Sequence, residues 1–284
     1  MIIEKKLRVI LLTHGGTEKA LEHLLALGNV EIRGIFIETE TERRRTPREK
    51  IERSIRYDGC RTTAIKLARK LARKLAPSAG AANGPGKSDR LCEIARAGGV
   101  PVQFVASYHS TEAMESMRAA GADLGIVLGT NILKEPVFSI PRLGSINLHQ
   151  GLAPLYRGGP PVFWELFNGE SEVGLTVHFV APKVDTGEIV LQETVPLAYD
   201  YSYDLDFEAF IEDYRRQLAD RSASLVAEAV RQIADQTYVT RPQDTSLGKR
   251  YRLPVKKEKD ELRRRLSARR ATARAFQRSA SAEN

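Results

Sequence analysis

The chain of 284 residues lacks several features that would assign it to a class at once. Its only two cysteines, Cys60 and Cys92, form no CxxC pattern and cannot make a disulfide framework. No stretch approaches 18 uninterrupted apolar residues, so the sequence predicts no transmembrane helix. The apolar stretch at the N-terminus is too short for a secretory signal, and we expect a reduced, cytoplasmic setting. No group of His, Cys, Asp and Glu has the spacing of metal ligands, so we expect no metal site.

The formal net charge of +8 is concentrated in one segment. Residues 249–278 contain 13 Lys and Arg against 3 Asp and Glu, a net charge of +10, which leaves −2 for the rest of the chain. This distribution indicates a basic tail on a nearly neutral globular body. A solvated helix is the simplest structure for the tail, and contact with RNA, an acidic partner or a membrane surface is the alternative.

Branched apolar runs alternate with stretches of helical periodicity along the first two thirds of the chain. This alternation predicts an α/β fold with a largely parallel sheet and helices on both faces. A long amphipathic helix or helix pair is expected at 207–236. The segment 77–88 has the composition of a flexible loop. The predicted strands cover 7–12, 30–38, 101–105, 122–129, 144–151, 174–180 and 188–197.

Polar side chains stand out at the end of the predicted strand 144–151. Asn147 and His149 are two positions apart, so both project from one face of the strand. A pair of this kind is costly to bury without hydrogen bonds, and it is either a bonded core pair or a functional one. His149 is a candidate acid, base or electrostatic donor, and Asn147 a candidate N–H donor to an oxyanion.

Two further segments belong with this pair. The loop GLAPLYRGGPP after the strand contains small and rigid residues that allow close backbone approach to a ligand. Asp185 lies in a Val-Asp-Thr-Gly turn between two predicted strands, and such a turn alone is more often structural. His178, within the strand 174–180, is interpreted as structural.

Residues 145–197, which begin SINLHQGLAPLYRGGPP and end with KVDTGEIVLQETVPL, resemble the core of the 10-formyltetrahydrofolate-dependent formyltransferase family. The shared pattern is N-x-H, a small-residue loop ending in proline and, some 35 residues later, a D-[TA]-G turn. A weaker likeness extends over residues 7–205. The resemblance implies a Rossmann-like formyltransferase fold with a mostly parallel twisted sheet, followed by a C-terminal helix and a basic tail.

The resemblance also implies roles for individual residues. Asn147 would hydrogen-bond the formyl oxygen, and His149 would stabilise the tetrahedral oxyanion, as the imidazolium. Asp185 would hold His149, raise its pKa and take part in the proton relay from the attacking amine. The co-substrate would be 10-formyltetrahydrofolate. Its binding would involve two backbone segments and the residue before Asp185: Thr130, Asn131, Ile132, Leu133, Gly151, Leu152, Ala153, Pro154 and Val184.

From these observations we expect three parts in the chain. Residues 1–205 would form the catalytic domain, with an insertion at about 39–95. Residues 206–240 would be a C-terminal helical segment, and 241–284 a basic, partly disordered tail.

The sequence leaves the formyl acceptor open. An amine of a nucleotide-linked amino sugar, or of a similar small molecule, fits best by elimination. Methionyl-tRNA is the alternative because of the RGGPP segment, although the helical residues 198–284 do not resemble the β-rich domain of that branch. Glycinamide ribonucleotide, a formyltetrahydrofolate hydrolase and a non-catalytic folate-binding scaffold remain as further alternatives.

Overall fold

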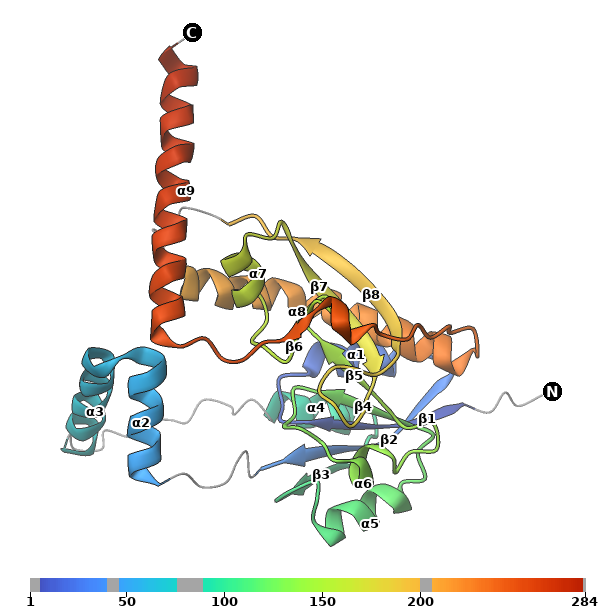
Figure 1. The fold of residues 1–284 in the computed structure, drawn as a ribbon. Helices are drawn as coiled ribbons and strands as arrows, with labels where there is room; N and C mark the ends of the chain where they lie inside the picture. The colour runs from blue at the N-terminus through green and yellow to red at the C-terminus, as the bar shows by residue number, and fades with distance from the viewer. Residues whose placement is uncertain (1–5, 40–45, 76–88, 200–205, 283–284) are drawn as a thin grey trace.

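A seven-stranded sheet forms the centre of the computed structural model, which describes residues 6–39, 46–75, 89–199 and 206–282 (Figure 1). The strand order is β3-β2-β1-β4-β5-β7-β8. The first five strands in this order pair in parallel, while β7 is antiparallel to both β5 and β8. The predicted α/β fold with a mostly parallel sheet is therefore confirmed. The strands are β1 (Leu7–Thr13), β2 (Val30–Glu38), β3 (Val102–Val105), β4 (Leu124–Leu128), β5 (Ser145–His149), β7 (Glu172–Phe179) and β8 (Ile189–Pro196).

Helices cover both faces of the sheet because its central strands are apolar on both sides. In β1, Val9 and Leu11 belong to one core cluster, while Ile10 and Leu12 belong to the other. The first cluster includes residues of α1 (Glu18–Leu25), α4 (Asp89–Ala97) and α8 (Phe207–Ala234), and the second includes residues of α5 (Thr111–Ala119) and α6 (Glu135–Phe138). These two sets of helices lie on opposite sides of the sheet in Figure 1. The span 39–95, expected as an insertion, includes the start of α4, whose Leu91 and Ala95 are fully buried in the core.

Further elements lie beside this body. The helices α2 (Pro47–Asp58) and α3 (Cys60–Leu75) form a pair near the beginning of α9 (Lys256–Ala282), and α7 (Phe163–Asn168) also contacts α9. A short parallel pair joins β6 (Tyr156–Arg157) to β9 (Lys249–Arg250), and the 3-10 helix η2 (Thr245–Leu247) precedes β9.

The basic C-terminal segment forms one helix that extends away from the body (Figure 1). We expected a basic, partly disordered tail here, with a solvated helix as its simplest structure. Leu262 and Leu266 near the start of α9 are instead buried, which anchors its first half to the core. Charge pairs between Lys256 and Asp260 and between Arg265 and Glu261 are spaced for support of a helix. The segment expected as a flexible loop, 77–88, lies outside the described residues.

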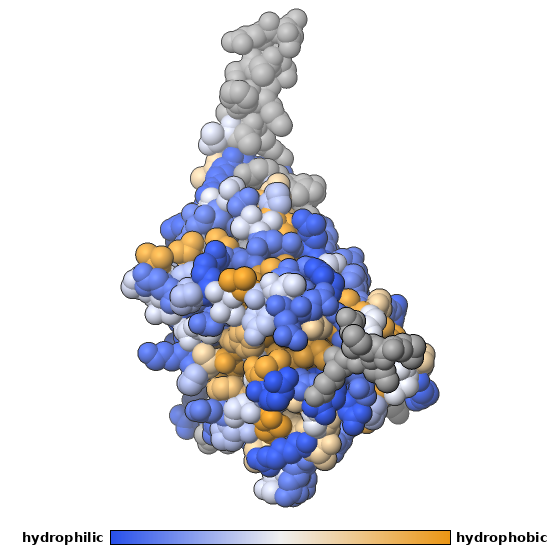
Figure 2. All heavy atoms as spheres, turned by 90° about the vertical axis from the view of Figure 1, so that its right-hand side faces the viewer, coloured by the Kyte–Doolittle hydropathy of each residue, from blue (hydrophilic) through white to orange (hydrophobic). Residues whose placement is uncertain are grey.

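The face of the molecule seen in Figure 2 is mostly hydrophilic, with hydrophobic side chains gathered over a smaller central area. Within the described parts of the chain, no helix combines the length and the apolar character that crossing a membrane requires.

An ion-pair cluster fixes the junction of β1 and β4. Asp123, only 2% exposed, accepts hydrogen bonds from the Arg8 guanidinium at 3.0 and 3.1 Å, from the Arg8 backbone N–H, and from Arg142 at 3.0 Å. The hydrogen bond from the Arg8 side chain is the main reason why the pKa of Asp123 lies well below its usual range. A lowered pKa means that the ionised carboxylate favours the folded state.

We expect Asp123→Asn to lower the free energy of unfolding by about 1–3 kcal/mol, because it replaces a buried carboxylate that accepts from two guanidinium groups with a neutral amide, a weaker acceptor. The matched control is Asp220→Asn, which removes an exposed pair with Lys19 and should change stability by less than about 0.5 kcal/mol. In the wild type, the contribution of Asp123 is complete above the unfolded pKa of about 3.9 and is lost as the pH falls below it. Urea unfolding of both variants at pH 7 and pH 3 measures this. An equal effect of the two substitutions at pH 7 would contradict it.

Candidate functional site

The strand β5 delivers Asn147 and His149 to the carboxyl end of the parallel part of the sheet. Its parallel neighbour is β4 and its antiparallel neighbour is β7. In the antiparallel register, Asn147 lies opposite His178 and His149 lies opposite Thr176. The face of β5 that carries Asn147 and His149 therefore continues across β7 into a third polar side chain, His178.

The turn between β7 and β8 places Asp185 over this face. Asp185 has a φ of 51°, in the left-handed region that aspartate tolerates better than most residues. The backbone N–H of Gly158 donates to its carboxylate at 2.8 Å and holds it in place. At Gly187, an added Cβ would lie 1.8 Å from the Phe179 carbonyl oxygen, so only glycine allows the chain to turn back here. The Asp-Thr-Gly sequence thus meets two separate backbone requirements of this turn.

In the structure the side chains of Asn147, His149 and Asp185 converge. One carboxylate oxygen of Asp185 lies 3.3 Å from Nδ1 of His149, and the other lies 3.5 Å from Nε2 of His178. The Asn147 amide nitrogen is 3.3 Å from the same His178 nitrogen. We refer to Asn147, His149, His178 and Asp185 as the polar cluster. Its carboxylate bridges two imidazoles.

His178 is the member that we interpreted from sequence as structural. Its Nδ1–H donates to the Phe179 carbonyl oxygen at 2.7 Å, which leaves Nε2 to face Asn147 and Asp185. The position is 2% exposed. A signal was present in the sequence, because His178 lies in a strand that directly precedes the Asp-Thr-Gly turn, but the strand register that pairs it with Asn147 is a property of the fold.

Both ring nitrogens of His149 face acceptors. The Nε2–H donates to the Tyr156 carbonyl oxygen at 2.7 Å, and Nδ1 faces Asp185. Gly151 makes room for the ring, because a Cβ at this position would lie 2.4 Å from Nε2 of His149. A ring N–H of His149 can therefore reach a ligand only by leaving the Tyr156 carbonyl or Asp185.

The ionisation states of the pair differ from our expectation for His149. Burial raises the pKa of Asp185, but the contact of its carboxylate with the His178 ring, the charges that His149 and His178 carry when they are protonated, and the N–H of Gly158 together hold it at about 2. For His149, burial lowers the pKa below its ordinary value, and this outweighs the opposite effects of Asp185 and the Tyr156 carbonyl. We had expected the neighbouring carboxylate to raise this pKa and favour the imidazolium. Near neutral pH the imidazole is instead mainly neutral beside an ionised Asp185.

A cavity of about 230 Å³ opens beside the polar cluster. Thr130, Asn131, Ile132, Leu133 and Val184, which we expected to bind the co-substrate, all line it. Ile132 is 64% exposed, which places a large apolar side chain at the surface of this site. Gly158 and Gly159 form another part of the wall.

The other four expected binding residues do not line this cavity. Gly151 packs behind His149, and Leu152 packs against Gly174, where a Cβ would lie 2.3 Å from the Leu152 backbone. Ala153 is 2% exposed, and its carbonyl oxygen accepts a hydrogen bond from Gln192. The peptide bond between Ala153 and Pro154 is cis. In this structure the segment 151–154 supports β5 and His149 from behind.

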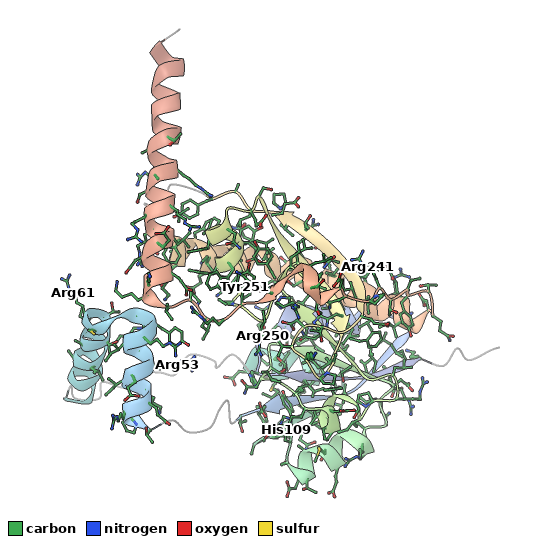
Figure 3. The ribbon with its side chains drawn as sticks, in the orientation of Figure 1. Arg53, Arg61, His109, Arg241, Arg250 and Tyr251 are labelled. Carbon is green, nitrogen blue, oxygen red and sulfur yellow. The ribbon has the colours of Figure 1, made fainter. Side chains whose placement is uncertain are left out.

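Residues 250–252 cover the loop that contains Gly158 and Gly159, which we call the glycine loop. The sequence did not indicate this contact. Tyr251 stacks on Tyr156 with a centroid distance of 5.1 Å and lies 5.0 Å from the Trp164 ring. An atom of the Arg250 side chain lies 3.0 Å from where a Cβ of Gly158 would be. Figure 3 shows Arg250 and Tyr251 on the segment that leads to α9. The indole N–H of Trp164 donates to the Arg252 carbonyl oxygen at 2.8 Å. Residues 250–252 therefore fix the loop whose Gly158 N–H holds Asp185.

Comparison with known proteins confirms the resemblance seen in the sequence. Residues 81–213 match the family described as formyl transferase. A methionyl-tRNA formyltransferase of Chlorobium chlorochromatii is 36% identical over 151 residues, which cover 53% of this chain and 46% of that protein. The matched residues cover between 31% and 46% of the length of this and two further curated relatives, which are also methionyl-tRNA formyltransferases.

Solved structures of formyltransferases share the fold. A glycinamide ribonucleotide transformylase of Symbiobacterium toebii superposes with a TM-score of 0.54 at 21% identity, over 84% of this chain and 95% of that chain. A sugar N-formyltransferase of Shewanella sp. FDAARGOS 354 superposes with a TM-score of 0.51 at 13% identity, over 87% and 76%. Throughout the described part of the chain, no group of three or more His, Cys, Asp and Glu is placed to hold a metal ion.

We expect Asp185→Asn to lower the pKa of His149 further, because the substitution removes the negative charge that opposes the effect of burial. Histidine ring resonances followed by NMR across pH 4 to 8 report this directly. The control resonance is that of His109, whose pKa is lowered by burial and which faces Glu38 and Lys134 rather than Asp185. A His149 pKa that rises or stays constant in Asp185→Asn would contradict the proposed balance.

Proposed function

We propose that this chain, whose residues 81–213 match the formyl transferase family, transfers a formyl group from 10-formyltetrahydrofolate to a primary amine. The observation that carries this proposal is the polar cluster at the end of β5, where an amide, two imidazoles and a carboxylate line one cavity. Acyl transfer to an amine needs an N–H donor to the developing oxyanion and a group that accepts a proton from the amine.

The reaction forms one bond and breaks another at the formyl carbon. The amine nitrogen attacks this carbon, the carbonyl oxygen becomes an oxyanion, and the bond to N10 of the folate then breaks. The amine loses one proton, and N10 of the leaving folate gains one. The proposed site must therefore stabilise one negative charge and move one proton.

Each member of the cluster has a distinct proposed role. Asn147 donates an amide N–H to the formyl oxygen. His149, neutral at rest with its proton on Nε2, accepts at Nδ1, beside Asp185, the proton that the amine loses, and gives up a proton to N10 as the folate leaves. Its Nε2–H stabilises the oxyanion by exchanging the Tyr156 carbonyl for the substrate. Asp185, with a pKa of about 2, is too weak a base to hold the proton and acts instead by orienting His149 and stabilising its charged form. His178 fixes Asn147 and Asp185.

The residues around the cavity fit the reacting end of a folate. The exposed Ile132 and the backbone of 130–133 offer an apolar edge with hydrogen-bonding groups beside it. A volume of about 230 Å³ is below the range of roughly 300–1,000 Å³ that is typical of drug-sized ligand sites. The cavity would therefore enclose the ring system near the formyl group and leave the rest of the folate on the surface.

We expect His149→Ala and Asp185→Ala each to slow single-turnover formyl transfer by about 10²–10⁴-fold. The double variant should be little slower than the worse single variant, because groups that act as one unit are not additive. His23→Ala is the matched histidine control, since His23 lies on α1 and does not line the cavity. Folate binding, measured by fluorescence, should be retained in all variants. Near-wild-type transfer by Asp185→Ala with folate bound would refute the role of Asp185.

For the acceptor, we propose the amine of a nucleotide-linked amino sugar or a similar small molecule. The described residues 206–282 support this choice, because they contain two long helices and a single two-residue strand rather than a β-rich domain. A second candidate is methionyl-tRNA, favoured by the sequence relatives with that name and by the arginines of α9. In α9, however, Arg263, Arg264 and Arg265 are already paired with acidic side chains.

A panel of acceptors tests this choice. The protein is incubated with 10-formyltetrahydrofolate and, in separate reactions, amino sugars linked to nucleotides, glycinamide ribonucleotide, methionyl-tRNA or no amine. We expect the formyl group to appear on an amino sugar. Formyl-methionyl-tRNA as the main product would favour the second candidate, and release of formate at the same rate without any amine would indicate a hydrolase.

A further inference from the structure

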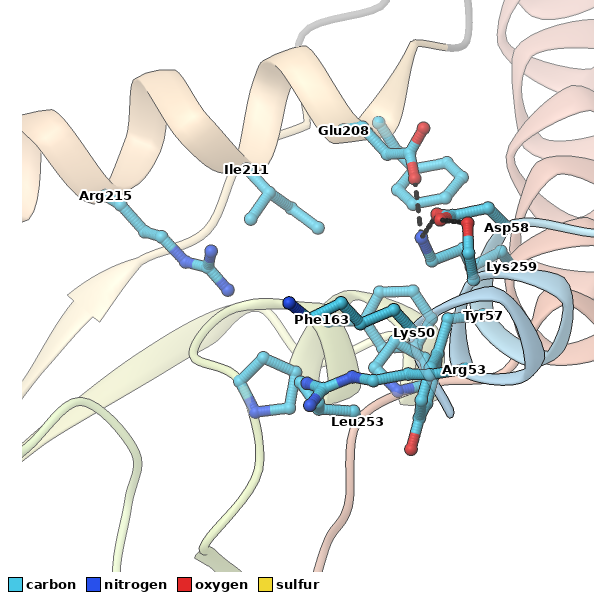
Figure 4. A pocket seen from close by; sticks show the side chains of 14 residues that line it. Lys50, Arg53, Tyr57, Asp58, Phe163, Glu208, Ile211, Arg215, Leu253 and Lys259 are labelled. Carbon is cyan, nitrogen blue, oxygen red and sulfur yellow. Dashed lines mark hydrogen bonds and ion pairs between the residues drawn. The ribbon is translucent and has the colours of Figure 1, made fainter. Parts of the chain in front are cut away.

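A second cavity lies outside the polar cluster. It has a volume of about 460 Å³, within the range of small-molecule sites, and it is bounded by α2, α7, α8 and the segment that leads into α9 (Figure 4). Both α2 and α9 lie outside the residues that match the formyl transferase family. The formyl transferase match therefore does not account for this cavity.

One face of α2 is directed at the cavity. Lys50, Arg53, Ser54 and Tyr57 follow the i, i+3, i+4, i+7 spacing of a single helix face, and all four line the cavity. Thr46 and Glu49 form a reciprocal cap that fixes the start of this helix. The orientation of the face is thus set by the helix itself.

The opposite wall contributes a guanidinium from α8. Arg215 is half-buried and donates two hydrogen bonds to the Pro161 carbonyl oxygen, at 2.7 and 3.2 Å. No carboxylate of the described chain lies within ion-pair distance of Arg215 or of Lys50. Figure 4 shows the Lys50 amino group and the Arg215 guanidinium directed into the same space from α2 and α8. Two cations that face one cavity repel each other unless an anion lies between them.

The carboxylates that line the cavity, Glu208 and Asp58, do not pair with Lys50 or Arg215. Glu208 and Asp58 both pair with Lys259, at 2.9 and 3.9 Å. Burial lowers the pKa of Arg215 below its ordinary value, which outweighs the charges of Glu165 and Glu212 and indicates an imperfectly compensated cation. The remaining charge at the Lys50 and Arg215 end of the cavity is positive.

An apolar wall lies beside this positive end. Phe163, Phe207 and Ile211 line the cavity, are each buried, and present aromatic and branched side chains. Leu253, from the segment before α9, is 43% exposed and completes this wall. A ligand that fits both parts carries an anionic group and a flat or apolar group.

The glycine loop of the polar cluster connects this cavity to the catalytic one. Gly159 lines the cavity of about 230 Å³, and the next residue, Pro160, lines the cavity of about 460 Å³. A smaller hollow between them is lined by His149, Gly159 and Pro160 together. A molecule bound in the larger cavity therefore lies one loop away from His149.

We propose that the cavity between α2, α7, α8 and α9 binds an organic phosphate, with the phosphate between Lys50 and Arg215 and the ring system against Phe163, Phe207 and Leu253. We further assign this site to the non-reacting end of the formyl acceptor. That second assignment rests on the proposed formyl transfer, whereas the phosphate site itself does not.

Binding of UDP, inorganic pyrophosphate and uridine to the full chain, measured by calorimetry, tests the site. We expect UDP to bind best, pyrophosphate more weakly and uridine weakest. Lys50→Glu and Arg215→Gln should each weaken UDP binding about tenfold or more. The matched controls are Arg48→Glu, on α2 but paired with Glu52 outside the cavity, and Arg216→Gln, next to Arg215 but exposed. Lys50 is exposed, so its substitution tests the site even if Arg215→Gln folds poorly.

The outcomes separate the site from the reaction. UDP binding that is weakened only by the two cavity substitutions supports the site, even if no amine in the panel is formylated. Equal UDP binding by all four variants, or no binding of UDP and pyrophosphate, overturns it even if formyl transfer is intact. Where a phosphorylated acceptor is found, Lys50→Glu should raise its KM about tenfold with little change in kcat. An unchanged KM would overturn the assignment to the acceptor.

Discussion

The carboxylate of Asp185 is the contact on which the arrangement of the site depends. It bridges His149 and His178, at 3.3 and 3.5 Å, and accepts the Gly158 N–H at 2.8 Å. The rest of the local structure makes this position possible. The β5–β7 register places His178 beside Asn147, and Gly187 lets the turn approach the Phe179 carbonyl. Residues 250–252 hold the glycine loop from outside. Substitutions far along the chain, such as those in residues 250–252 before α9, should therefore change the position of Asp185 and, through it, that of His149.

Burial and charge act against each other within this cluster. Burial lowers the pKa of His149, while Asp185 remains ionised with a pKa of about 2. A neutral imidazole beside a carboxylate can gain a proton during a reaction, and the carboxylate then stabilises the imidazolium that forms. This suits a reaction in which an amine loses its proton as an oxyanion develops. The same arrangement would stabilise a permanently charged His149 less well, because burial disfavours the imidazolium.

Most of the sheet could be predicted from the sequence, because β1 is an apolar run and β2 and β8 combine branched apolar residues with polar ones between turn residues. Asn147 and His149 were candidates because two polar residues share one face of a predicted strand, whereas Asp185 was assigned to them only through the family resemblance. The role of His178 could not be predicted, because it depends on an antiparallel register. The Tyr156 carbonyl and the Gly158 N–H are backbone groups, and their roles cannot be predicted from the residue type. The larger cavity joins Lys50 to Arg215 across 165 positions, a proximity that only packing creates. The helix α2, by contrast, carried a capping box at Thr46 and Glu49 that sequence reasoning overlooked.

The central claim is that Asn147, His149, His178 and Asp185 act together on a formyl carbonyl. Isotope-edited infrared spectroscopy of 10-formyltetrahydrofolate, labelled with ¹³C at the formyl carbon, tests it most directly. On binding to the wild-type protein, the formyl carbonyl stretch should move to lower frequency, because an N–H donor polarises the C=O bond. The shift should disappear in Asn147→Ala while the folate remains bound. A carbonyl frequency that is the same in bound and free folate, with saturation of the protein confirmed, would contradict the account.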